Sequence, residues 1–214
     1  MTIPRRGLLG LTLAGAAAAC ASPEPSYYTL AAVPGPAKPG GPASVELRRP
    51  GLAGYLDRPE IVRANSAYSL RLAGRERWGE PLGDLVARIL AEDLNMRLPG
   101  SSVFTSAGSI TAEADGTIEM DIQRFDADPS GQVVVLAQVA VSRGQARASA
   151  TTRIVRLTVR PASASTADLV AAMSTALGQL ADAIAAMLRA EGSVRPPHDG
   201  QPAGRRSRRR AASL

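Results

Sequence analysis

The sequence predicts an α+β fold in which two main helices cover a largely antiparallel sheet, forming a two-layer sandwich. Short strand-like segments precede a helical stretch that begins near residue 82. Three longer strand-like segments then precede a second helical stretch that begins near residue 166. Both helical stretches carry a single apolar stripe, which must be buried against another element. We therefore expect both helices to pack on the sheet.

The chain begins with a segment typical of an export signal. Arg5 and Arg6 precede the uncharged residues 7–19, which end at Cys20, the only cysteine. This run is much shorter than the ~20 residues that a membrane-spanning helix needs. A basic start, a short apolar stretch and small residues before the cleavage point predict a signal peptide over residues 1–19. Both the general secretory route and the twin-arginine route fit this segment.

Cys20 is the predicted lipid-anchor residue. Ala17, Ala18 and Ala19 resemble the lipobox of bacterial lipoproteins, with Ala17 in place of the usual leucine. The alternative is a secreted protein with one free thiol, which would have no partner in an oxidising compartment. In lipoproteins the cysteine becomes the acylated N-terminus, and its acyl chains hold the protein to a membrane. Because Ala21 and not aspartate follows, the resemblance implies the inner leaflet of the outer membrane, facing the periplasm.

The positive charge of the chain lies at its ends. The 25 basic and 19 acidic residues give a net charge of +6. Arg5, Arg6 and five arginines within residues 205–210 account for seven basic side chains, so residues 20–204 hold 18 basic and 19 acidic ones, a net of −1. This balance gives no indication of nucleic-acid binding. With one histidine, His198, the chain provides neither a catalytic triad nor a typical zinc site, and we expect no cofactor.

The first half of the domain predicts short strands and one helix. Strands are expected at residues 27–30, 44–48, 61–63, 68–72 and 102–105, with a hairpin loop at Asn65–Ser66. Pro81 favours a helix start, and Pro99 ends the helix after about Leu98. Its buried stripe should contain Leu82, Leu85, Val86, Ile89 and Leu90. Asp93 and Arg97 are spaced to pair at i, i+4.

The second half predicts a three-strand antiparallel meander and a long helix. Residues 118–123 alternate in polarity, residues 133–141 are nearly all apolar as in a strand covered on both faces, and residues 147–159 alternate again. A turn is expected at residues 126–131. Ser165 to Asp168 resemble a capping box, and apolar residues recur behind it every three or four positions to about Gly192.

These observations divide the chain into four parts. Residues 1–19 are the signal peptide, residues 20–26 a lipidated tether, residues 27–192 one domain, and residues 193–214 a disordered arginine-rich tail. The tail is interpreted as a solvated end, and electrostatic contact with anionic phospholipid is the alternative.

Three segments resemble one family. They are Tyr27-Tyr28-Thr29-Leu30, Tyr55-Leu56-Asp57-Arg58-Pro59-Glu60-Ile61-Val62 and Arg77-Trp78-Gly79-Glu80-Pro81-Leu82. In this order they resemble the PqiC (YmbA-type) family, the auxiliary lipoprotein component of ABC-type transport systems. The resemblance implies a fold similar to the amino-terminal domain of TolB. It also implies a non-enzymatic accessory subunit of an MCE (mammalian cell entry) system that moves lipids, phospholipids in particular, between membranes. The implied partner is the MCE-domain protein of a PqiB-like system. The resemblance leaves open whether the chain forms a homo-oligomer.

Four residues of these segments are candidate partner-binding residues: Tyr55, Leu56, Arg58 and Trp78. Interface composition favours Tyr55 and Leu56 as contact anchors. For Arg58 we favour a structural turn in which the Asp57 carboxylate caps backbone N–H groups and pairs with the guanidinium. Trp78, at the entrance of the predicted helix, is interpreted as a core residue, with an interface role as the alternative.

Two other functions are alternatives to the transport role. One is a structural lipoprotein that links envelope layers, and the other, with less support, is a lipid-anchored periplasmic enzyme. The scarcity of histidine and cysteine and the lack of a glycine-rich phosphate loop argue against the enzyme.

Overall fold

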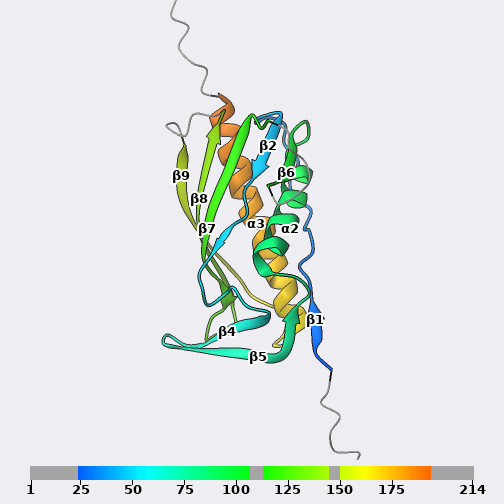
Figure 1. Ribbon diagram of the computed structural model, residues 1–214, viewed down its shortest axis with the longest axis vertical. Coiled ribbons are helices and arrows are strands. Elements are labelled where there is room, and N and C mark those ends of the chain that lie inside the picture. Colours follow the sequence, from blue (N-terminus) through cyan, green and yellow to red (C-terminus); the bar gives the residue numbers. More distant parts are fainter. Residues whose placement is uncertain (1–23, 107–112, 145–149, 194–214) are drawn as a thin grey trace, which may run out of the picture.

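The computed structural model describes residues 24–106, 113–144 and 150–193. A twisted sheet forms one layer, and helices α2 (Leu82–Arg97) and α3 (Thr166–Ser193) form the second (Figure 1). Aliphatic side chains from the helices and the long strands make up the core between the layers. The predicted α+β two-layer architecture is therefore confirmed.

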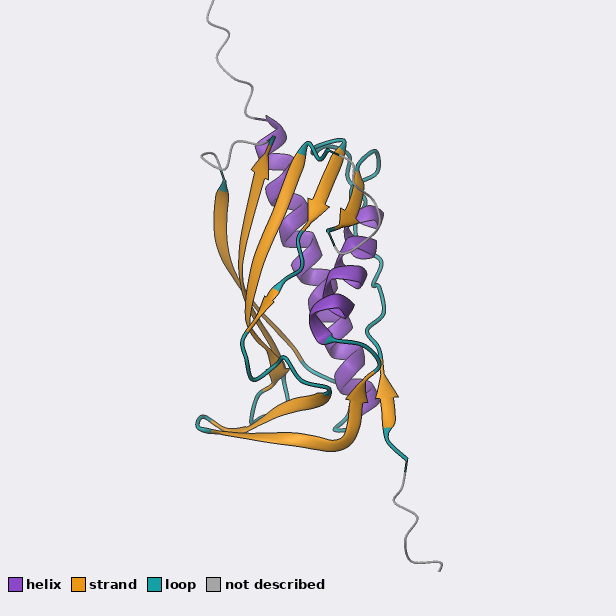
Figure 2. Cartoon of the chain, in the orientation of Figure 1, coloured by secondary structure: helices purple, strands orange, loops and turns teal. Residues whose placement is uncertain are grey.

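The longest pairings of the sheet are antiparallel. β7 (Gly116–Ala127), β8 (Val133–Arg143) and β9 (Thr151–Val159) form the predicted meander (Figure 2). The expected start of the last strand at residue 147 lies outside the described residues. A β-bulge between Ile122 and Arg124 shifts the register of β7, and the buried Phe125 beyond it faces the core again.

β8 is covered on both faces only over its first residues. Val133, Val134 and Val135 are buried, whereas Gln138 farther along the strand is exposed. The helices cover one face of the sheet, and the opposite face opens to solvent along most of β8. The expectation of a strand covered on both faces over residues 133–141 is therefore wrong beyond Val135.

The short strands at the start of the chain join the sheet in parallel. β2 (Ser44–Leu47) lies between β6 (Ser102–Thr105) and β7, and β3 (Gly51–Leu52) pairs with β7 farther along. β1 (Ser26–Tyr28) pairs with the end of β5 (Ser69–Trp78). The first described strand is thus held by a strand that lies about 50 residues later in the sequence.

β4 (Glu60–Ser66) and β5 form a longer hairpin than the sequence predicted. Ser66 pairs with Ser69, their hydroxyl oxygens are 2.8 Å apart, and the Tyr68 N–H donates to Ser66 Oγ at 3.2 Å. These serine contacts close the turn at residues 67–68. The expected loop at Asn65–Ser66 is therefore wrong by two residues.

α2 begins after Pro81, as predicted. The Pro81 carbonyl accepts hydrogen bonds of 3.0 Å from the N–H groups of Asp84 and Leu85. The predicted stripe is confirmed, since each of its members is at most 3% exposed: Leu82, Leu85, Val86, Ile89 and Leu90.

α3 begins at a side-chain cap that the sequence predicted. Ser165 Oγ accepts a hydrogen bond of 3.1 Å from the Asp168 N–H. The Asp168 carboxylate bonds the Ser163 hydroxyl, which in turn accepts from the Ser165 N–H at 3.1 Å. By length and composition α3 could cross a membrane, but 67% of its most apolar stretch is buried in the protein. Its apolar stripe therefore covers the sheet.

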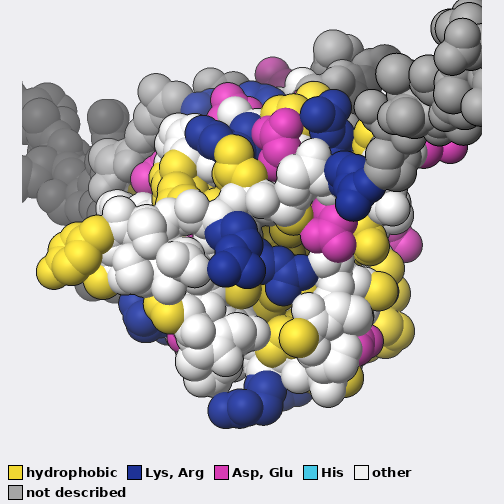
Figure 3. Space-filling model, turned by 90° about the horizontal axis from the view of Figure 1, so that it is seen from below, with side chains coloured by type: hydrophobic (Ala, Val, Ile, Leu, Met, Phe, Trp, Pro, Cys, Tyr) yellow, Lys and Arg dark blue, Asp and Glu magenta, His cyan; other side chains and the backbone are white. Residues whose placement is uncertain are grey.

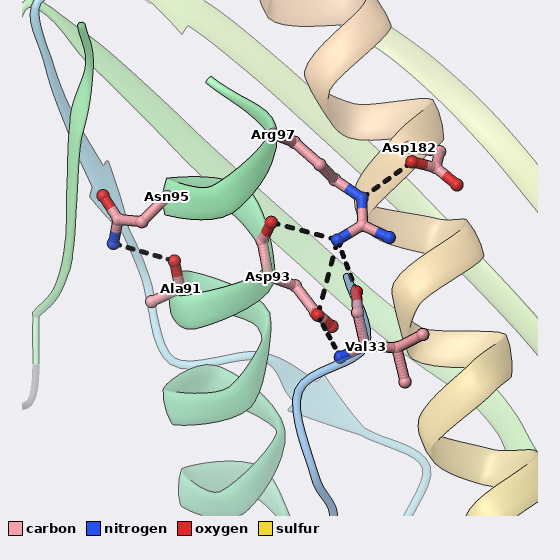
Figure 4. Close-up of polar contacts among 6 residues, drawn as sticks. All are labelled: Val33, Ala91, Asp93, Asn95, Arg97 and Asp182. Carbon is pink, nitrogen blue, oxygen red and sulfur yellow. Dashed lines mark hydrogen bonds and ion pairs between the residues drawn. The ribbon is translucent and has the colours of Figure 1, made fainter. Parts of the chain in front are cut away.

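A buried ion pair connects the two helices to the segment after β1 (Figure 4). Asp93 and Arg97 are 0% and 2% exposed, with Oδ1 and Nη1 3.4 Å apart, which confirms the predicted pairing. Arg97 Nε also donates to Asp182 of α3 at 2.7 Å. The Val33 N–H donates to Asp93 at 2.8 Å, and the Val33 carbonyl accepts from Arg97 at 2.9 Å. The loop that leads from β1 is thereby fixed on the helix layer.

Candidate functional site: the Arg58–Trp78 hollow

The three segments that carry the sequence resemblance are joined by backbone hydrogen bonds. Tyr28 of β1 lies opposite Trp78 of β5 in the parallel pairing. The Gly79 N–H donates to the Tyr28 carbonyl at 2.9 Å, and the Trp78 N–H donates to the Pro59 carbonyl at 2.8 Å. Segments that are far apart in the sequence therefore form one structural unit.

A hollow of about 400 Å³ lies between the second and third segments, and we call it the Arg58–Trp78 hollow. Every residue that lines it belongs to those two segments: Asp57, Arg58, Pro59, Trp78, Glu80, Pro81 and Leu82. The residues of the resemblance thus line a single concave surface, which makes it the candidate functional site.

The apolar side chains that line the hollow are fixed by packing in the hydrophobic core. Trp78 is 5% exposed and Leu82 is 2% exposed, and both belong to the main hydrophobic core. The interpretation of Trp78 as a core residue is confirmed, and its small remaining surface lines the hollow. An apolar surface that is fixed in this way suits a partner side chain, because binding would order few additional groups.

Arg58 supplies an unsatisfied donor at the same place. Its Nε is buried and makes no hydrogen bond within the part of the chain that the structure describes. A buried donor without an acceptor costs about 1–3 kcal/mol relative to a paired one. A carboxylate or carbonyl oxygen of a bound partner would satisfy this N–H if the Arg58 side chain turned to expose it, and the bond to the guanidinium would be charge-assisted.

The turn before β4 is held by the backbone and not by Asp57. The Leu56 N–H donates to the Ala53 carbonyl at 2.8 Å, and the Arg58 N–H donates to the Leu56 carbonyl at 2.9 Å. The Asp57 side chain is exposed, and among the described residues it neither caps a backbone N–H nor pairs with Arg58. The favoured interpretation of an Asp57-capped turn is therefore wrong.

Two ion pairs involve Glu80 of the hollow and Asp84, which follows its last lining residue in the sequence. Glu80 pairs with Arg88 at 2.5 Å, and Arg49 pairs with Asp84 at 2.6 Å. The hydrogen bond to Asp84 raises the pKa of Arg49, with a smaller contribution from the charge of Asp57. Exposed pairs of this kind contribute only about 0–1 kcal/mol to stability. Glu80 thus places a charged side chain beside the apolar lining, a combination that is usual in protein interfaces.

Two predicted contact residues lie elsewhere. Leu56 is 1% exposed and packs in the core, so it offers no surface to a partner and its expected role as an anchor is wrong. Tyr55 is half-buried, and its hydroxyl donates to the Gln123 carbonyl at 3.4 Å. Burial raises the pKa of Tyr55 to about 12, and the nearby carboxylate of Asp126 adds to the effect. Of the four candidates, only Arg58 and Trp78 line the hollow.

Other lining residues were not singled out from the sequence as binding residues. Pro59, Glu80, Pro81 and Leu82 belong to the resembling segments, and that membership was the signal that identified them. Cys20 lies outside the described residues. Among the residues that the structure describes, no group of three or more His, Cys, Asp or Glu side chains is placed to hold a metal ion.

A larger hollow of about 890 Å³ contains none of the resembling residues. It involves β2, β7, β8 and the start of β9. Several charged side chains line it, with Arg48 paired to Glu119 at 2.5 Å and to Glu46 at 3.9 Å. Its charged side chains already satisfy one another in part. We therefore place the candidate site at the Arg58–Trp78 hollow.

Comparison with known proteins identifies the family of this chain. A family model described as ABC-type transport auxiliary lipoprotein component matches residues 28–185, which include every residue of the hollow. A Xanthomonas campestris structure of a DUF330 protein is similar, with a TM-score of 0.65, 18% identity, and coverage of 78% of this chain and 96% of that one.

A second solved structure, described only as that of an uncharacterized protein, has a TM-score of 0.65 and 17% identity, and covers 77% of this chain and 99% of its own. At these identities the structures show a shared fold. No match was found among curated proteins. The family match covers most of both layers, and the chain belongs to the family of ABC-type transport auxiliary lipoprotein components.

Proposed function

We propose that the protein is a non-enzymatic accessory subunit of an MCE-type lipid-transport system. In this proposal it is anchored through acylated Cys20 in the inner leaflet of the outer membrane and faces the periplasm. Family membership associates it with an ABC-type transport system and with a membrane-anchored place in the cell envelope. The observation that carries the proposal is the Arg58–Trp78 hollow, where the family segments present an apolar surface beside an unsatisfied donor.

The hollow would receive the MCE-domain partner. Trp78 and Leu82 would contact one apolar or aromatic side chain of that partner. The Arg58 guanidinium, turned toward the partner, would donate to a neighbouring carboxylate or backbone carbonyl. Aromatic side chains and arginine are the residue types that contribute most often to the energetic centre of an interface. The lipoprotein would thereby hold the outer end of the MCE-domain protein at the outer membrane.

The anchor limits how far this hollow can stand from the membrane. β1 begins at Ser26, six residues after Cys20. Six residues span at most about 20 Å when fully extended. Because β1 is joined to Trp78 by strand pairing, the hollow would stay near the bilayer surface.

Affinity purification tests the proposal. The full-length protein with a C-terminal tag is isolated from a detergent extract of envelopes, and the partners are identified by mass spectrometry. We expect an MCE-domain protein together with subunits of an ABC permease. We also expect Cys20→Ser to leave the membrane fraction. Recovery of only peptidoglycan-bound proteins or porins would instead support a structural lipoprotein and contradict the transport role.

A further inference from the structure

We infer that the β4–β5 hairpin is a second membrane contact, which docks on the anionic phospholipid surface to which the tether leads. This inference rests on the proposed acylation of Cys20. The hairpin and the acyl chains would then hold the domain at two points, which fixes its orientation as well as its distance from the bilayer.

The hairpin exposes apolar side chains next to one another. Tyr68 in its turn is 99% exposed, and Leu70 and Leu72 of β5 are 48% and 42% exposed. Successive residues of a strand alternate between faces, so Leu70 and Leu72 share one face of β5. Neighbouring exposed apolar side chains on a soluble domain indicate an interaction surface more strongly than isolated ones do.

Exposed arginines accompany these apolar residues. Arg71 and Arg75 of β5 are both exposed, while Arg63 of β4 donates a hydrogen bond of 2.6 Å to the hydroxyl of Thr166. Figure 3, which views the molecule from below, shows several basic side chains spread over this end, with apolar side chains and some acidic ones beside them. A surface with this composition suits the region of anionic headgroups, where tyrosine is enriched and arginine is attracted by the surface potential.

Strand pairing places the hairpin at the tethered end of the molecule. β1 pairs with the last residues of β5, Ser26 opposite Glu76 and Tyr28 opposite Trp78. The tether leads to β1, and β5, which pairs with β1, is also one strand of the hairpin. Figure 1 shows the hairpin crossing the end at which β1 begins, whereas α3 ends at the opposite end. Tyr27 of β1 is itself 64% exposed, so a further tyrosine lies beside the tether.

The bilayer is favoured over a protein as the occupant because the tether brings it within reach. At most about 20 Å of extended chain separates Cys20 from Ser26, and attraction between charges persists over ~8 Å at physiological salt. The exposed hairpin would then lie among the headgroups. Leu70 and Leu72 are on one face of β5 and Arg71 is on the other, so insertion by the turn and edge of the hairpin would bring both kinds of side chain into the headgroup region. The following test also distinguishes the bilayer from a second copy of the chain or another protein bound at the hairpin.

A dye at the hairpin turn tests the inference. The sulfur of acylated Cys20 is a thioether, so Tyr68→Cys provides the single free thiol of the mature lipoprotein for a polarity-sensitive dye. The protein is reconstituted in vesicles of phosphatidylethanolamine and phosphatidylglycerol with quencher-bearing lipids. We expect blue-shifted emission and quenching several-fold stronger than for a dye at the matched control Ile154→Cys, an apolar position that is 71% exposed on β9. Adding Arg71→Glu and Arg75→Glu should reduce the quenching at position 68.

The outcomes distinguish this inference from the function on which it rests. Mass spectrometry of the same sample shows whether Cys20 is acylated, and an unmodified Cys20 would contradict the anchor and the hairpin contact together. With Cys20 acylated, equal quenching at positions 68 and 154 would overturn the hairpin contact alone. Blue-shifted emission without lipid quenching would show that a protein covers the hairpin, and would also overturn it.

Discussion

Arg97 of α2 donates a hydrogen bond of 2.9 Å to the backbone carbonyl of Val33, which lies 64 residues earlier in the chain. One turn before it, Asp93 accepts a hydrogen bond of 2.8 Å from the N–H of the same valine. The two side chains therefore satisfy both backbone groups of Val33, which would otherwise be costly to leave unpaired away from water. Because Val33 follows β1, this pair connects the tethered end of the chain to the helix layer.

Removing the Arg97 side chain should destabilise the protein strongly. Arg97→Ala leaves the buried Asp93 carboxylate without its cation, and we expect the free energy of unfolding to fall by about 3–5 kcal/mol. Urea denaturation measures the change. Arg48→Ala is the matched control, because its pair with Glu119 joins side chains that are 42% and 46% exposed. It should cost only about 0–1 kcal/mol. Equal losses for the two variants would contradict a structural role for the buried pair.

The space around Arg97 predicts the effect of a single methyl group. A Cβ on Gly35 would overlap the guanidinium of Arg97, whose buried position leaves little room for it to move. We expect Gly35→Ala to lower the free energy of unfolding by about 1–3 kcal/mol. Gly54→Ala is the control, since its Cβ would meet nothing within 4 Å, and it should stay within about 0.5 kcal/mol of the wild type. Equal thermal midpoints for the two variants would show that the Arg97 side chain shifts to make room for the methyl group, and would contradict this prediction.

Asp93 should make stability decrease with rising pH. Burial raises the pKa of Asp93 above its ordinary value of 3.8, although the Val33 N–H and Arg97 oppose the shift. Between these two pKa values the folded state binds more protons than the unfolded state, so this residue's contribution is lost as the pH rises. We expect the wild type to lose stability relative to Asp93→Asn in urea titrations as the pH rises from the ordinary value of 3.8 through the raised folded value.

Asp128 supplies a control of opposite sign. Burial acts against its ionisation, but hydrogen bonds from the Ser130 hydroxyl and from the N–H groups of Ser130 and Gln132 together outweigh this and lower the pKa of Asp128. Its contribution is present above its ordinary value of 3.8 and is lost as the pH falls through the lowered folded value. Relative to Asp128→Asn, the wild type should therefore lose stability on acidification. The same direction for both variants would contradict the two assignments.

Local patterns predicted the elements that local interactions build. The cap of α3 at Ser165, the start of α2 after Pro81 and the pairing of Asp93 with Arg97 all depend on residues within four positions of one another. The turn at residues 67–68 was missed because serine hydroxyl contacts, and not a standard loop sequence, close it. The parallel pairing of β1 with β5 and the binding of Val33 join distant segments, and neither leaves a periodic signal in the sequence.

The candidate site was predicted in part. Family resemblance drew attention to the segments that line the hollow, and Arg58 and Trp78 do lie there. Leu56 was misassigned because an apolar residue beside charged ones can face either the core or solvent, and here it faces the core. The unsatisfied Nε of Arg58 depends on what surrounds it in three dimensions, so composition and spacing cannot predict it.

The affinity of the lipoprotein for the MCE-domain protein tests the account most directly. The dissociation constant is measured with purified proteins for the wild type, for Arg58→Glu, and for Arg153→Glu, which changes an exposed arginine on β9 outside the hollow. We predict at least tenfold weaker binding for Arg58→Glu, equivalent to about 1.4 kcal/mol, with an unchanged thermal midpoint and with no effect of Arg153→Glu. Unchanged affinity for Arg58→Glu, or a lower thermal midpoint with full binding, would contradict the hollow as the partner site.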